Sequence, residues 1–97
     1  MTFKVIGLME LTDQNAFEQY RQQVGQTVEL FKGQIKARGV ITEIFWNELH
    51  CMPFNTFVEL YFPSKEDAHA WVHSPQYQSL VPIRNQAMKL TLFGISI

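Results

Sequence analysis

The spacing of apolar residues changes several times along the chain, and each change marks an expected element. Residues 3–10 are mostly apolar and end at a Leu-Thr-Asp turn, which predicts a strand. Apolar residues then recur at spacings of three and four, which predicts a helix of about five turns with one buried face. Asp13 is placed to cap this helix, and Gly33 is expected to terminate it. The apolar stripe consists of Phe17, Tyr20, Val24, Val28 and Phe31.

A long hairpin is expected next. Residues 34–46 are rich in β-branched and aromatic side chains, and residues 57–62 form a second apolar run after a loop at 47–56. Gly39 lies inside the first of these strands, where a glycine indicates a bulge or a close backbone approach.

Two serines begin the helical segments of the second half. Ser64 is followed by Asp67 in a pattern typical of a capping box, and Ser74 precedes Pro75 at a first helical position. Pro82 is expected to interrupt the second helical segment before a last strand at 88–97. The order β-α-β-β-α-β predicts a single α+β domain over residues 1–97, with a ferredoxin-like, four-stranded antiparallel sheet.

Both faces of this sheet are apolar, which predicts an assembly. In the last strand, Leu90 and Leu92 lie on one face, whereas Phe93 and Ile95 lie on the other. The helices can cover only one face, so we expect a homodimer in which two sheets meet and close a barrel. The alternative is a monomer that exposes an apolar sheet.

Composition and charge exclude several classes of protein. The 97 residues carry a net charge of −1, which argues against a nucleic-acid partner bound through a basic face. No uncharged apolar run approaches the roughly 20 residues needed to span a membrane. The N-terminal residues lack a signal-peptide pattern, so we expect a cytoplasmic protein. A single cysteine, Cys51, excludes an internal disulfide framework.

Several residues of the second half resemble a known family, the bacterial domain of unknown function 1330. That family is similar in turn to the dimeric α/β barrel superfamily, so the resemblance implies this fold and a homodimer. It implies no established reaction, because relatives with this architecture include cofactor-free monooxygenases, isomerases and haem-using enzymes. The resemblance rests on Phe62-Pro63-Ser64, Ala68, Trp71, Ser74-Pro75, Tyr77 and Arg84, with Ala37-Arg38-Gly39 upstream.

Arg38 is the first candidate for binding chemistry. If Ile35 packs on the helices, alternation places Arg38 on the barrel face, together with Glu59 and Tyr61 of the next strand. A guanidinium in a partly apolar cleft binds carboxylates through its planar fork, and Glu59 is the candidate for catalytic proton transfer. The alternative is a structural pair between Arg38 and Glu59, or with a carbonyl group.

Tyr77 and Arg84 complete the candidate ligand-binding set. Arg84 is expected either to reach an acidic ligand at the open end of the sheet or to bind carbonyls freed by Pro82. His69 and His73 share a helical face, but two ligands rarely make a metal site, so we expect no metal. No cofactor-binding motif is present either.

Three functions fit these patterns. The first is a pocket between sheet and helices for a small acidic or aromatic ligand, with or without metal-free catalysis. The second is a non-catalytic binding or assembly module with a filled barrel. The third is RNA binding, since Phe57 and Tyr61 alternate on one strand, but the net charge and the intervening Glu59 oppose it. We adopt the first.

Overall fold

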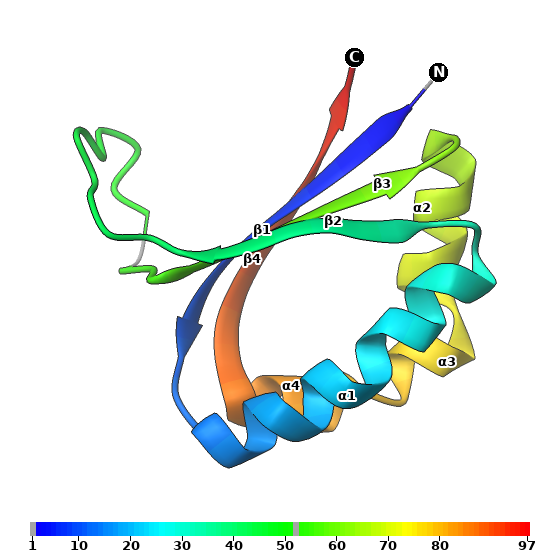
Figure 1. The fold of residues 1–97 in the computed structure, drawn as a ribbon, viewed down its shortest axis with the longest axis horizontal. Helices are drawn as coiled ribbons and strands as arrows, with labels where there is room; N and C mark the ends of the chain where they lie inside the picture. The colour runs from blue at the N-terminus through cyan, green and yellow to red at the C-terminus, as the bar shows by residue number, and fades with distance from the viewer. Residues whose placement is uncertain (1, 52) are drawn as a thin grey trace.

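The structure, a computed structural model, describes residues 2–51 and 53–97 and has the expected α+β architecture. Its four strands form one antiparallel sheet in the order β2-β3-β1-β4, which is the ferredoxin-like order, and the helices all lie against one face (Figure 1). The strands are β1 (Phe3–Leu11), β2 (Gln34–Val40), β3 (Thr56–Phe62) and β4 (Met88–Ser96). The helices are α1 (Gln14–Leu30), α2 (Lys65–His73), α3 (Pro75–Gln78) and α4 (Val81–Ala87).

The predicted helix starts are confirmed by hydrogen bonds. The Asp13 carboxylate accepts from the backbone N–H of Ala16 at 3.1 Å, and the Ser74 hydroxyl accepts from the N–H of Tyr77 at 3.1 Å. Ser64 caps α2 in the same way. Pro82 lies in the first turn of α4, so it begins a new helix as well as ending the previous segment.

The end of α1 differs from the expectation. Lys32, with a φ of 68°, takes the left-handed conformation that was expected at Gly33. The glycine is needed for a different reason, because a Cβ there would lie 2.6 Å from the Phe62 ring and 2.8 Å from Val28. Gly33 therefore lets the chain pass close to the buried core as it enters β2.

The two faces of the sheet have different environments. The face toward the helices is buried, and Val5 pairs there with Leu60. The opposite face, here called the open face, is not covered within this chain, and Phe93 remains 43% exposed. The predicted apolar character of both faces is confirmed. The open face carries Lys4, Ile6, Leu8, Phe57, Glu59, Tyr61, Phe93 and Ile95.

A β-bulge changes which side chains of β2 point toward the helices. Ile35 pairs with Leu60 on the helix side, but the register shifts between Ile35 and Ala37, so that Lys36 is an extra residue. Arg38 consequently pairs with Val58 and points toward the helices. The expectation that Arg38 lies on the barrel face is wrong, because strict alternation was assumed through this segment.

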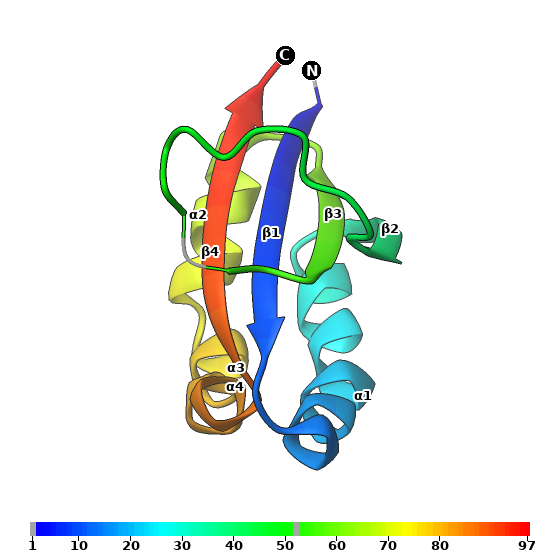
Figure 2. The ribbon, with the colours of Figure 1, turned by 90° about the vertical axis from the view of Figure 1, so that its left-hand side faces the viewer.

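The hairpin connection is longer than expected. The bulge is not at Gly39, where a Cβ would meet nothing within 4 Å, and β2 ends at Val40. Residues 41–51 and 53–55, here called the arm, project from the end of the sheet on the side away from the helices (Figures 1 and 2). Asn47 braces the arm, since its side chain bonds both the N–H and the carbonyl of Cys51. The arm exposes Ile44, Phe45, Trp46 and Leu49.

The core lies between the helices and the sheet. Trp71 is its largest fully buried side chain, and its indole N–H donates to the Thr27 hydroxyl at 3.0 Å. Tyr77 and Phe62 pack against Trp71, with ring centroids 4.5 and 5.5 Å away. Over residues 2–51 and 53–97, no helix has both the length and the apolar character required to cross a bilayer.

Candidate functional site

A cavity of about 420 Å³ lies between α1 and the helix side of the sheet. Its volume is within the range of small-molecule sites, and most of its wall is apolar, as in such sites. The apolar wall includes Met9, Phe17, Val24, Val58, Leu60 and Leu90.

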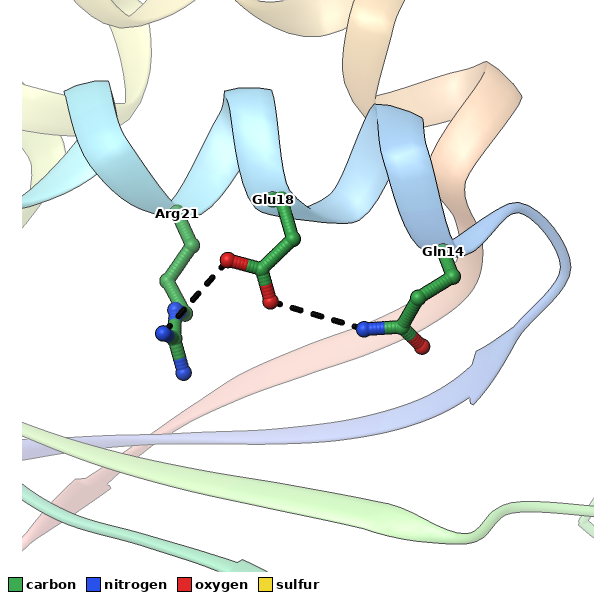
Figure 3. Close-up of polar contacts among 3 residues, drawn as sticks. All are labelled: Gln14, Glu18 and Arg21. Carbon is green, nitrogen blue, oxygen red and sulfur yellow. Dashed lines mark hydrogen bonds and ion pairs between the residues drawn. The ribbon is translucent and has the colours of Figure 1, made fainter.

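Polar side chains gather at the mouth of the cavity. Gln14, Glu18 and Arg21 lie on one face of α1 and extend toward the sheet (Figure 3). The Glu18 carboxylate accepts from the Gln14 amide at 3.4 Å and forms an ion pair with Arg21 at 3.5 Å. Arg38 lines the same mouth from β2, because the bulge turns it to this side. The mouth therefore combines two guanidinium groups with one carboxylate.

The inner end of the cavity contains two phenols. The hydroxyls of Tyr20 and Tyr77 are 3.0 Å apart, and the guanidinium of Arg84 donates to the Tyr77 oxygen at 2.9 Å. Burial, with a smaller effect of Tyr77, raises the pKa of the Tyr20 hydroxyl far above its ordinary value. Tyr20 is therefore a neutral hydrogen-bonding group throughout the physiological pH range.

The structure brings together three of the residues predicted from sequence. Arg38 and Tyr77 both line the cavity, and Arg84 reaches it through its bond to Tyr77. The Arg84 guanidinium bonds this buried phenol and, among the described residues, no carbonyl near Pro82, whereas its expected contact with an acidic ligand stays a prediction.

Glu59 and Tyr61 lie on the other side of the sheet. The Glu59 carboxylate pairs with Lys4 at 3.7 Å, so the expected pair with Arg38 does not form. The ammonium groups of Lys4 and Lys36 lie over the Tyr61 ring, 5.2 and 5.1 Å from its centroid. Tyr61 and Glu59 together raise the pKa of Lys4. Glu59 is therefore not positioned to transfer a proton in this cavity.

The histidine pair has an ordinary helical arrangement. The rings of His69 and His73 stack 6.3 Å apart, and a ring nitrogen of His73 bonds the His69 carbonyl at 2.9 Å. In the part of the chain that the structure describes, no three His, Cys, Asp or Glu side chains gather to hold a metal ion.

Sequence reasoning missed the residues that α1 contributes to the site. Arg21 is not among the residues singled out from the sequence, and Tyr20 is placed there on the apolar stripe alone. A signal was available, since Gln14, Glu18 and Arg21 recur at spacings of four and three beside that stripe. Such spacing places polar groups at the edge of the buried face, where a cavity mouth would lie.

Sequence comparison identifies the family. The pattern of the family described as "domain of unknown function" (DUF1330) matches residues 5–96. The chain belongs to the DUF1330 family. The resemblance seen in the sequence is thereby confirmed for the whole domain. No curated protein matches the DUF1330 chain.

Solved structures share the fold of this DUF1330 protein at low sequence identity. RPA0582 of Rhodopseudomonas palustris, of unknown function, has a TM-score of 0.78 and 15% identity, covering 99% of this chain and 82% of its own. SnoaB of Streptomyces nogalater, a cofactor-independent oxygenase, has a TM-score of 0.69 and 7% identity over 99% and 92% of the two chains. A dimeric ferredoxin-like protein from Jannaschia sp. CCS1 has a TM-score of 0.69 and 8% identity, and both chains are fully covered.

Proposed function

We propose that this DUF1330 protein binds a small, largely apolar molecule with an acidic or aromatic group in the cavity beneath α1. The observation that carries the proposal is the distribution of polarity in the cavity. Its wall is largely apolar, its charged side chains are exposed or half-buried, and its two phenols are buried. This is the arrangement by which small-molecule sites combine burial with orientation.

Arg38 is the proposed anion-binding group. It lies on the edge strand at the cavity mouth, and within residues 2–51 and 53–97 it forms no ion pair. Its donors therefore remain available to a ligand carboxylate or enolate. Tyr77 contributes a hydroxyl at the opposite end, and Arg84 fixes that hydroxyl.

A metal-free enzyme is the finer form of this proposal. The shared fold with SnoaB, a cofactor-independent oxygenase, supports it by analogy. The alternative is a non-catalytic binding or assembly module. Ligand binding without turnover would favour that alternative.

We also propose that the open face is covered by a second copy of this chain. The open face and the arm lie on the same side of the molecule, away from the helices (Figures 1 and 2), and both expose apolar side chains. A second copy would bury both surfaces together. The dimeric ferredoxin-like protein from Jannaschia supports this arrangement.

The cavity is tested by filling it. We expect 2-naphthoate to bind the wild-type protein in isothermal titration calorimetry, and Val24→Phe to weaken binding roughly tenfold or more, because Val24 lines the cavity. Leu30→Phe is the matched control, since Leu30 lies on the same helix but is 64% exposed. Equal affinities for the wild type and Val24→Phe would contradict the proposed site.

A further inference from the structure

The hydroxyl protons at the inner end of the cavity do not all have a partner within the site. The Arg84 guanidinium donates to the Tyr77 oxygen, so that oxygen accepts. The contact between Tyr20 and Tyr77 uses one of the two phenol protons. In residues 2–51 and 53–97, no further side-chain hydrogen bond involves either hydroxyl. One phenol O–H therefore remains free to donate into the cavity that both tyrosines line.

The direction of the chain of hydrogen bonds decides which proton is free. A phenol that accepts from a guanidinium becomes a stronger donor, because successive hydrogen bonds polarise one another. The distance allows either hydroxyl to donate, and polarisation by Arg84 favours Tyr77 as the donor to Tyr20. Tyr20 is also the more accessible of the two, with 9% of its surface exposed against 2% for Tyr77. Both arguments favour Tyr20 as the residue whose proton is free.

We propose that the Tyr20 hydroxyl donates a hydrogen bond to an oxygen of the ligand, and that the ligand class is a small aromatic carbonyl compound or its enolate. This inference rests on the proposed function of the cavity and names the group recognised at its inner end. Arg84 and Tyr77 act as positioning residues, since they orient and polarise the donor. The apolar wall between the inner end and the mouth receives the aromatic ring.

Two probes of similar shape test the proposal. 2-Acetylnaphthalene has a carbonyl acceptor, and 2-ethylnaphthalene lacks it. We expect the wild-type protein to prefer the ketone, and Tyr20→Phe to weaken ketone binding about three- to tenfold while leaving the hydrocarbon unchanged. If both probes bind and Tyr20→Phe affects them equally, the inference fails but the cavity proposal stands. If neither probe binds, the cavity proposal itself fails.

Infrared spectroscopy of the bound ketone separates the two phenols. Donation from Tyr20 lowers the carbonyl stretching frequency in the wild-type complex, and Tyr20→Phe should abolish this shift. Tyr77→Phe removes only the polarising partner, so a smaller shift should remain. Complete loss of the shift in Tyr77→Phe, with retention in Tyr20→Phe, would overturn the assignment to Tyr20. Thermal melting confirms that each variant is folded.

Discussion

Arg38 shows how one side chain acquires its setting from the backbone around it. It lies on an edge strand, exposed, at a cavity mouth that already contains the Glu18–Arg21 ion pair. Because Glu18 is engaged by Arg21, the charge of Arg38 is not neutralised there within the described chain. An exposed arginine in this position costs the protein little stability, and its guanidinium is available to a ligand.

Substitutions of Arg38 distinguish a binding role from a structural one. Arg38→Lys keeps the charge but loses the planar fork, so 2-naphthoate affinity should fall about three- to tenfold by calorimetry. Arg38→Met should lower it further. Because the residue is exposed, both variants should keep the free energy of unfolding within about 0.5 kcal/mol of wild type. An unchanged affinity together with a lowered melting temperature would assign Arg38 a structural role.

For single residues, the sequence predicted which residues belong to the site better than it predicted on which face of the sheet each side chain lies. Tyr77 and Arg84 follow from the family resemblance, and both belong to the inner end of the site. Tyr20 could not be distinguished from its apolar neighbours, because a tyrosine on a buried stripe buries its ring whether or not its hydroxyl has a function. The side of the sheet on which Arg38 lies depends on a β-bulge that the residue types alone do not reveal.

Among the elements, the junction between α1 and β2 is the most tightly constrained. The backbone at Gly33 passes directly against Phe62 and Val28, both of which are almost fully buried. Any side chain there would push against groups that have no space to move. This junction fixes where β2 begins, and therefore where the cavity wall begins.

A pair of glycine substitutions tests this constraint. Gly33→Ala places a methyl group 2.6 Å from the Phe62 ring and should destabilise the protein by about 1–3 kcal/mol in urea unfolding. Gly39→Ala is the control, since a Cβ there meets nothing within 4 Å and the change should be within about 0.5 kcal/mol. Equal losses in the two variants would contradict the close-approach argument.

The type and order of the elements could be predicted well from the sequence. Asp13, Ser64 and Ser74 each cap a helix as expected, because capping depends on local chemistry that a short segment contains in full. Strand ends were less certain. Most of the β-branched and aromatic residues of segment 34–46 lie after Val40, so composition alone extended the strand to Trp46, whereas β2 ends at Val40.

For the whole molecule, the open face is the feature that most affects behaviour in solution. Phe93 on β4 pairs with the half-buried Ile6 on β1, and both Phe93 and Ile95 are exposed. Coverage by a second copy would also hide Phe57 and Tyr61 from nucleic acid, in line with the predicted absence of RNA binding. That absence and a cytoplasmic location stay predictions.

The dimer is tested by sedimentation. The wild-type protein should sediment at twice 11.3 kDa at micromolar concentration. Phe93→Glu should raise the dimer dissociation constant roughly 100-fold or more, because it buries an unpaired charge. Leu30→Glu, which changes an exposed apolar residue on the helix side, should remain dimeric. A folded wild-type monomer at high concentration would exclude this assembly.

The extra residue in β2 also has an evolutionary consequence. Because Lys36 is accommodated as an extra residue on an edge strand, substitutions that straighten the bulge without shortening the chain would carry the Arg38 side chain across the sheet, whereas loss of the Lys36 codon would leave Arg38 opposite Val58. Gain or loss of this one bulge at constant chain length could therefore exchange a residue between the cavity and the open face while the buried strands stay in register. Gene duplicates of such a protein could diverge in what they recognise without first having to evolve a new core.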